Sequence, residues 1–377
     1  MQKKAMLATT VALFALAGAA GAQEFNDPAE FARQRAQLSM TPQGPEGQPW
    51  AQHLGDSMVD TAKWKKDGPA TICFSNAGIF NPWRVVGMHN FQAEAEAQGD
   101  RIKELIVVDA EGKDEKQIAD IEALVAGGKC DVLIVSPNTT AALTPAVEAA
   151  ATKLPVVVFD RGVNTTAPVT YIHPVGGYGF GISSGEFIAA NLEKGANVLA
   201  LRIVPGVDVL ETRYSAAKNI FDEAGLNVVG SEFTGSDRAK TKSVVEDYLN
   251  RGIQIDAIWM DAGDTATAAL EAFEDAGLPY PVISGEDQQD FLRKWRDENL
   301  TAIAPSYPTY QWRTPIIAAL DILDGKPVPG PEWVLPQPAI TAETRDGYID
   351  EKLPPLHYSL CGCQDLPGYP ARWGGSD

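Results

Sequence analysis

The sequence predicts an α/β protein made of two doubly wound parallel-sheet lobes. Short apolar runs alternate with amphipathic segments, and this alternation occurs twice along the chain. Near-continuous apolar strands are typical of parallel sheets that helices cover on both faces. The length of 377 residues is sufficient for two domains of roughly 150 residues each. Two such units in tandem predict a cleft between lobes, where a small ligand would bind.

The first unit begins near residue 70 with an apolar strand. Asn81 precedes Pro82, and this order predicts a helix start, because Asn caps free amide groups and Pro fits the first helical turn. A later helix is predicted by apolar residues at helical spacing: Ile118, Ile121, Leu124 and Val125. The predicted strands are 71–75, 102–109, 131–136 and 156–160, and a further helix spans 144–153.

The second unit repeats the same alternation after residue 196. Its predicted strands are 197–204, 226–232, 257–261 and 282–285. The helices expected after them are 211–224, 240–251, 265–276 and 288–299. Each apolar run is again short enough for a strand and each amphipathic segment long enough for a helix.

The N-terminal segment has the features of a secretory signal peptide. Lys3 and Lys4 precede an apolar run from 5 to 20, and Ala-Gly-Ala at 20–22 has the form of a cleavage site. The run is shorter than the ~20 residues that a membrane span needs, although an anchor helix is the alternative. No Cys follows the cut for acylation. We expect residues 1–22 to be removed and the product to be periplasmic.

Charge and motifs argue against several other classes of protein. The formal net charge of −19 opposes nucleic acid as a partner. The turn at 75–80 does not match the G-x-G-x-x-G of nucleotide-dependent oxidoreductases, and the glycine cluster at 176–181 has the wrong spacing. P-loop and H-E-x-x-H motifs are absent from the sequence. A transcriptional regulator would need a helix-turn-helix before the first strand and a cytoplasmic location. The signal peptide and the acidic charge oppose both. We therefore expect neither catalysis nor a cofactor.

Four cysteines permit more than one arrangement. An oxidising compartment and an even count allow disulfides among Cys73, Cys130, Cys361 and Cys363, and buried free thiols are the alternative. His357 lies four residues before Cys361, which leaves a metal site open as a weaker interpretation. We expect one or two structural bridges and no metal.

Ligands of such sheets contact residues just past the carboxyl ends of the strands. Those positions hold aromatic, carboxylate and guanidinium side chains from both units. Aromatic faces cover the apolar face of a sugar ring, carboxylates accept hydrogen bonds from hydroxyl groups, and Arg donates them. The mixture suits a neutral polyhydroxyl ligand, with closure of the lobes around it. The candidate residues are Asn81, Trp83, Arg84, Asp160, Arg161, Arg213, Asp261 and Asp287.

Each candidate also has a structural alternative. These are Trp83 packing on the sheet, Arg84 as a surface cation, Asp160 and Arg161 in an exposed turn, Arg213 paired with Glu211, and Asp261 and Asp287 as helix caps.

From about Ala70 to Leu335 the chain resembles type I periplasmic sugar-binding proteins, the ribose- and galactofuranose-binding kind that supplies ABC importers. Four motifs carry the resemblance: 81–83 (Asn-Pro-Trp), 134–137 (Ile-Val-Ser-Pro), 158–161 (Val-Phe-Asp-Arg) and 285–287 (Gly-Glu-Asp). The resemblance implies a three-strand hinge between the lobes, and sugar contacts from Asn81, Trp83, Asp160, Arg161, Arg213 and Asp287.

Departures from the ribose pattern argue against plain ribose. Arg84 stands where ribose binders have a second aromatic, which is closer to the galactofuranose pattern, and Asp261 stands in place of an Asn. The loop at 236–238 lacks an aromatic, and Pro305-Ser306-Tyr307 replaces a Gln-containing hinge.

The resemblance also implies a division of the chain. Lobe 1 would comprise 70–173 plus 305–334, and lobe 2 would comprise 174–304, with crossovers near 173–174, 305–306 and 333–335. An N-terminal arm (23–69) and a C-terminal extension (335–377) lie outside the family pattern.

The predicted function is capture of a monosaccharide or related polyol by a monomer, followed by delivery to an ABC transporter permease in the inner membrane. A receptor for another polar ligand or for a chemotaxis signal is the alternative, and an enzyme on the same fold is a third.

Overall fold

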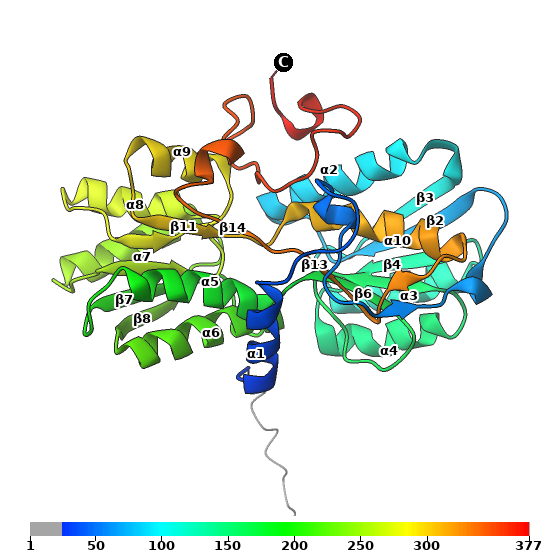
Figure 1. Ribbon diagram of the computed structural model, residues 1–377, viewed down its shortest axis with the longest axis horizontal. Coiled ribbons are helices and arrows are strands. Elements are labelled where there is room, and N and C mark those ends of the chain that lie inside the picture. The colour runs from blue at the N-terminus through cyan, green and yellow to red at the C-terminus, as the bar shows by residue number, and fades with distance from the viewer. Residues whose placement is uncertain (1–24, 377) are drawn as a thin grey trace, which may run out of the picture.

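The computed structural model describes residues 25–376, so the expected signal peptide lies outside the described residues. Figure 1 shows two α/β lobes side by side, and each is built on a six-stranded sheet. The predicted fold class is confirmed. None of the helices in residues 25–376 is both long and apolar enough to cross a bilayer.

The sheet of lobe 1 is entirely parallel, with strand order β13-β6-β5-β4-β2-β3. Alternate residues of its strands face two separate apolar layers, with α2 and α10 on one face and α3 and α4 on the other. The elements are β2 (Ala70–Asn76), α2 (Pro82–Ala97), β3 (Ile102–Asp109), α3 (Asp114–Ala126), β4 (Val132–Ser136), α4 (Thr140–Ala151), β5 (Val156–Phe159), β6 (Thr170–Pro174), α10 (Thr314–Leu323) and β13 (Glu332–Leu335).

Lobe 2 has the strand order β14-β11-β10-β9-β7-β8, and only the edge strand β14 runs antiparallel to its neighbour. Its elements are α5 (Gly177–Ala190), β7 (Asn197–Arg202), α6 (Asp208–Ala224), β8 (Asn227–Phe233), α7 (Arg238–Asn250), β9 (Ala257–Met260), α8 (Ala266–Asp275), β10 (Val282–Ser284), α9 (Gln289–Asp297), β11 (Ala302–Pro305) and β14 (Ala339–Ile340).

Three chain segments join the two sheets. The chain leaves lobe 1 between β6 and α5, returns between β11 and α10, and leaves again between β13 and β14. This is the three-strand hinge that the family resemblance implied. The second crossing carries a short 3-10 helix, Thr309–Trp312, whose side chains are buried.

Helix α5 is the main element that the sequence interpretation missed, because its first turns are rich in glycine. Glycine disfavours helices, but here it permits close packing of α5 against α6. A Cβ at Gly177 would lie 2.0 Å from the hydroxyl oxygen of Thr212, and one at Gly181 would lie 2.1 Å from the carbonyl oxygen of Arg213. The glycines therefore fix the distance between these helices.

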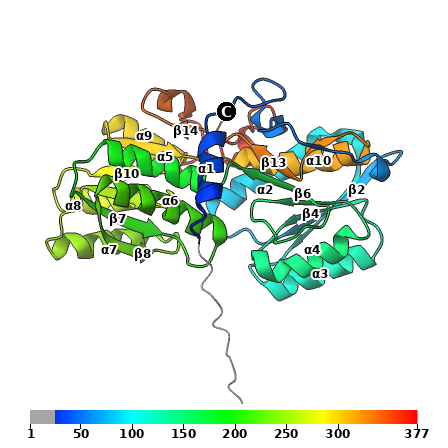
Figure 2. The same ribbon diagram turned by 60° about the horizontal axis from the view of Figure 1, so that its bottom comes forward.

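Both terminal segments pack on the lobes. Helix α1 (Pro28–Gln37) lies between the lobes in Figure 2. Its Arg33 donates to Glu332 of β13 at 2.9 Å, while Arg35 pairs with Glu186 of α5 at 2.9 Å. Farther along, β1 (Met58–Val59) pairs with β12 (Val328–Pro329). The N-terminal segment thus contacts both lobes.

The four cysteines form two disulfides, Cys73–Cys130 and Cys361–Cys363. This pairing excludes the free-thiol alternative, and it leaves no thiolate for the metal interpretation at His357. The first bridge ties β2 to the segment before β4 and closes a loop with a sequence separation of 57. The second closes a turn with a separation of only 2.

We expect the two bridges to differ in their effect on stability. Chain-entropy arguments give about 4 kcal/mol for a loop of the first size, whereas the second bridge restricts the unfolded chain very little. Replacing Cys73 and Cys130 by Ala should therefore lower the free energy of unfolding by about that amount, measured by urea denaturation. The Cys361→Ala/Cys363→Ala protein is the matched control, and an equal loss in both would contradict the prediction.

Candidate functional site

A cavity of ≈ 340 Å³ lies between the lobes and receives side chains from both. From lobe 1 come residues that follow β2 and β5, and from lobe 2 residues that follow β7, β8, β9 and β10, together with the first turns of α6. The lining residues are Phe80, Asn81, Trp83, Arg84, Asp160, Arg161, Ile203, Val204, Val207, Val209, Leu210, Arg213, Gly235, Ser236, Ala262, Asp264, Glu286, Tyr307 and Tyr358.

Six of the eight predicted site residues line this cavity, and they are Asn81, Trp83, Arg84, Asp160, Arg161 and Arg213. Asn81 caps α2, because its side-chain oxygen accepts from the Arg84 backbone N–H at 2.9 Å. The capping prediction is confirmed. The cap fixes where α2 begins, and it thereby sets the positions of Trp83 and Arg84 at the cavity wall.

Arg84 and Asp160 form a buried ion pair at the lobe 1 wall, with 2.6 Å between Nη2 and Oδ2. Both side chains are almost fully excluded from solvent, so Arg84 is not the surface cation of the structural alternative. Its Nη1 also donates to Asn76 Oδ1 and Ser136 Oγ, each at 3.3 Å. Burial lowers the pKa of Arg84 to about 10, and Asp160 opposes that shift. Asp160 is therefore the partner that compensates the buried charge of Arg84.

Asp160 adopts a left-handed backbone conformation, with φ of 67°. Asp tolerates this region better than most residues. The Asp160 carbonyl accepts hydrogen bonds from the hydroxyls of Tyr171 at 3.1 Å and Tyr307 at 3.2 Å. The next residue, Arg161, lines the cavity and donates to the Asn138 carbonyl. Hydrogen bonds therefore fix the Asp160-Arg161 turn at the cavity wall, and it is not an exposed surface turn.

Aromatic side chains cover one side of the lobe 1 wall. The indole N–H of Trp83 donates to the Tyr307 carbonyl at 2.7 Å, and the two rings are 5.8 Å apart. The Arg84 guanidinium lies 5.0 Å from the centre of the Phe80 ring. Trp83 thus packs against protein and also lines the cavity, so the packing alternative and the site prediction both describe it. Phe80 is half exposed at the cavity mouth.

Arg213 is the corresponding cation of lobe 2. Its guanidinium lies 4.2 Å from the centre of the Phe180 ring and 4.8 Å from that of Tyr307, and it donates to the Asp261 carbonyl. Glu211 does not pair with it, because that carboxylate binds Arg202 at 2.6 Å. Within residues 25–376, the Arg213 Nε finds no hydrogen-bond partner. A buried donor in this state is available to a ligand.

Two carboxyl groups of lobe 2 line the cavity, and burial raises the pKa of both. The pKa of Glu286 rises to about 8, with Asp287 and Asp264 adding to the effect and Arg213 opposing it. The pKa of Asp264 rises to about 6, opposed by the Ser236 hydroxyl. Oδ1 of Asp264 is buried and has no partner in the described chain. A protonated Glu286 can both donate to and accept from a ligand hydroxyl.

Asp261 and Asp287, the other two predicted site residues, do not line the cavity. Asp261 accepts at Oδ1 from the Ile203 N–H at 2.9 Å, and Asp287 accepts at Oδ2 from the Leu360 N–H at 2.7 Å. Neither caps a helix, since α8 begins after Thr265 and α9 after Gln288. Both carboxylates hold neighbouring backbone in place, and their contact with a ligand stays a prediction.

Sequence reasoning missed several lining residues: Phe80, Ser236, Asp264, Tyr307 and Tyr358. Glu286 and Asp287 both follow β10, and Asp287 was chosen as the candidate; Asp264 stands three positions after Asp261 in the loop that follows β9. Tyr307 follows β11 at a crossing between lobes. Tyr358 comes from the C-terminal segment, for which strand order gives no expectation.

A second cavity of ≈ 400 Å³ adjoins the first and shares Asp160, Arg161 and Tyr307 with it. Helix α1 contributes Glu30 and Arg33 to this second cavity. The N-terminal segment therefore closes one side of the space between the lobes.

Comparison with known proteins decides the family. A model described as periplasmic binding protein domain matches residues 72–327, which is more than half of the chain. The chain belongs to the periplasmic binding protein family. The matched range contains all eight residues that the sequence interpretation selected, and it ends before the C-terminal extension.

Curated relatives agree with this assignment. The ribose import binding protein of Bacillus subtilis (strain 168) is 33% identical over 259 residues, which cover 68% of this chain and 83% of the relative. The galactofuranose-binding protein of Escherichia coli (strain K12) is 26% identical over 218 residues, covering 56% of this chain and 67% of that protein.

Solved structures share the fold. An ABC transporter solute binding protein from Thermobispora bispora superposes with a TM-score of 0.68 at 24% identity, covering 81% of this chain and 97% of that one. At this identity the match supports the architecture alone.

The Arg84–Asp160 pair yields a stability prediction. Asp160→Asn keeps a residue that tolerates positive φ but leaves Arg84 as an uncompensated buried cation. We expect a loss of about 3 kcal/mol or more in the free energy of unfolding, measured by urea denaturation. Arg35→Ala is the matched control, because its ion pair with Glu186 is half exposed and should contribute less than ~1 kcal/mol. Equal, small losses in both variants would contradict the prediction.

Glu286 yields a pH prediction for the unliganded protein. Its folded-state pKa of about 8 lies above the ordinary glutamate pKa of 4.5, so the folded state holds the proton more tightly than the unfolded chain. The resulting stabilisation is complete below the unfolded pKa and is lost as pH rises toward 8. Glu286→Gln cannot ionise and lacks this loss.

Urea denaturation at a series of pH values tests this. The free energy of unfolding of wild type should fall relative to that of Glu286→Gln between about pH 5 and about pH 8, by a few kcal/mol at most. Glu186→Gln, at a half-exposed position, should track wild type. Parallel curves for wild type and Glu286→Gln would show that Glu286 does not titrate in this way.

Proposed function

We propose that this protein captures a monosaccharide or related polyol between its lobes and delivers it to an ABC transporter permease. The observation that carries the proposal is the interlobe cavity, whose walls combine aromatic faces with paired donors and acceptors from both lobes. Such a site binds and orients a ligand. Because the proposed role is binding, the mechanism requires no catalytic residue.

The wall chemistry favours an uncharged ligand with several hydroxyl groups. On lobe 1, the guanidinium of Arg84 is already neutralised by Asp160 at 2.6 Å. On lobe 2, Arg213 lies 3.9 Å from Glu286, whose raised pKa favours the neutral form. The matched pair on lobe 1 and the neutral carboxyl on lobe 2 offer directional hydrogen bonds to a ligand. Hydroxyl groups, which both donate and accept, suit this pattern best.

Trp83 and Phe80 supply the complementary apolar surface. A sugar ring has an apolar C–H face, and an aromatic ring covers it with large contact area. Both residues line the same cavity as the polar groups. The relatives named above bind ribose and galactofuranose, which supports a sugar of this size class, and Arg84 favours a ligand other than plain ribose.

Release to a membrane partner is part of the proposal. A ligand can contact both lobes at once only when the lobes are closed. Bound sugar therefore stabilises the closed state. A permease that recognises the closed arrangement of the two lobes would receive only loaded protein. The proposal includes a periplasmic address through the N-terminal segment 1–22, and a monomeric receptor.

Thermal melting of the protein beginning at Gln23 tests the proposal. The panel contains pentoses, hexoses, sugars that populate furanose forms, and polyols. A ligand at 100 times its dissociation constant adds ~2.7 kcal/mol to folded-state stability and raises Tm by a few degrees. We expect such a shift with one or a few related sugars, after unfolding and refolding to remove any ligand carried through purification.

Matched arginine variants distinguish the cavity from the surface. Arg161→Ala removes a cation at the cavity wall and should reduce the sugar-induced shift. Arg101→Ala removes a surface cation paired with Asp324 and should leave the shift unchanged. A wild-type Tm that responds to none of the panel would refute the sugar proposal.

A further inference from the structure

The C-terminal tail, residues 341–376, crosses from lobe 2 to lobe 1 as a fourth link between them (Figure 1). On the lobe 2 side, Gln289 of α9 donates to the Tyr348 carbonyl at 2.9 Å and to Ser359 Oγ at 2.7 Å. The Leu360 N–H donates to Asp287 Oδ2 at 2.7 Å. These bonds hold the tail against the loop that follows β10.

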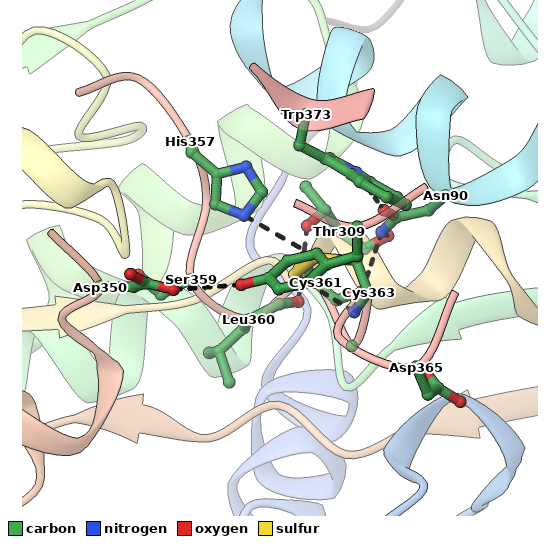
Figure 3. The surroundings of a disulfide bond; sticks show 12 residues. Asn90, Thr309, Asp350, His357, Ser359, Leu360, Cys361, Cys363, Asp365 and Trp373 are labelled. Atoms are coloured by element: carbon green, nitrogen blue, oxygen red, sulfur yellow. Dashed lines mark hydrogen bonds between the residues drawn. A yellow bond between two sulfur atoms is a disulfide. The ribbon is translucent and has the colours of Figure 1, made fainter. Parts of the chain in front are cut away.

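On the lobe 1 side, the tail is held by α2. The amide of Asn90 donates to the Cys361 carbonyl at 2.8 Å, and its oxygen accepts from the indole N–H of Trp373 at 2.9 Å. Both Asn90 and Trp373 are buried. Figure 3 shows Asn90 between the Cys361–Cys363 turn and Trp373. One side chain thus connects two parts of the tail to lobe 1.

The disulfide turn fits closely against the protein body. A Cβ at Gly362 would lie 2.4 Å from the Trp50 ring, so only glycine fits between the two cysteines. Arg313, which is paired with Glu94 of α2 at 2.7 Å, donates to the Gly362 carbonyl. The turn is therefore fixed in position from two sides.

Between these two anchors the tail places Tyr358 in the wall of the ligand cavity. Its side chain is 2% exposed, and its hydroxyl donates to Glu286 Oε2 at 3.3 Å. Its backbone pairs with that of Gln288 in an isolated antiparallel bridge. The anchors on both sides leave this side chain little freedom to move away from the cavity.

We propose that the C-terminal tail completes the ligand site and that Tyr358 is a specificity-determining residue for the sugar. This inference rests on the proposed function. Tyr358 lies beyond residues 72–327, the part that matches the family model, so it adds a contact to the shared site. The phenol hydroxyl, beside the Glu286 carboxyl, can donate a hydrogen bond to a ligand hydroxyl, accept one from it, or do both.

The test is calorimetric titration of Tyr358→Phe with the tightest-binding sugar of the panel and its single-deoxy analogues. Phe keeps the ring and removes only the hydroxyl. We expect affinity for the sugar to fall by about five- to ten-fold, and the penalty for one deoxy position to shrink. Tyr369→Phe is the matched control, because its hydroxyl donates to Asp350 in the same tail at 3.1 Å, away from the cavity. That variant should bind as wild type does.

Melting temperature and affinity together decide the outcome. Wild-type affinity and an unchanged deoxy ranking in Tyr358→Phe would overturn the tail proposal while leaving the sugar receptor intact. A lowered Tm with wild-type affinity would also overturn it, because Tyr358 would then act in folding alone. A wild-type protein that binds none of the panel would overturn both this inference and the proposed function.

Discussion

The buried ion pair between Arg84 and Asp160 is the interaction on which the site depends. It joins the first turn of α2 to the turn after β5, two elements separated by 76 positions in the sequence. A charge buried without its partner is costly, so neither element can shift without the other. The pair also fixes the residues next to each partner, Trp83 and Arg161, at the same wall. The position of the lobe 1 cavity wall therefore depends on one ion pair at the carboxyl ends of the parallel strands.

Lobe 2 positions its cation by steric fit instead. Arg213 lies on α6, and the backbone at this residue contacts Gly181 of α5, where no side chain could be accommodated. Phe180 and Tyr307 then enclose the guanidinium on two sides. Burial raises the pKa of the nearby Glu286 and Asp264 carboxyls, and a protonated carboxyl can donate as well as accept hydrogen bonds. One lobe thus uses electrostatic pairing and the other uses close packing to present the same chemical group.

Much of this arrangement could be predicted from the sequence, because strand periodicity and the strand-end rule are local. Asn81 and Pro82 marked the start of α2, and the Asp160-Arg161 pair after an apolar run marked the cavity wall. The rule failed where side-chain direction matters. Both Glu286 and Asp287 follow β10, and Asp287 was chosen as the candidate, whereas Glu286 lines the cavity, because position after a strand does not determine which of two neighbouring side chains faces a ligand. Helix α5 was missed because its glycines serve a tertiary contact that local propensity does not register. Tyr358 could not be found, because nothing local indicates where an irregular tail returns to the body.

The glycines of α5 have a consequence for how the protein can change over time. Gly177 and Gly181 do not line the ligand cavity, yet a larger residue at either position would displace α6, which carries Arg213. Ligand preference can drift by exchanging residues on the cavity wall, but only while these two positions stay constant. Directed evolution toward a new sugar would therefore tolerate broad variation in the loops and almost none along this helix face. Recognition thus depends on a helix surface that works because it carries no side chains.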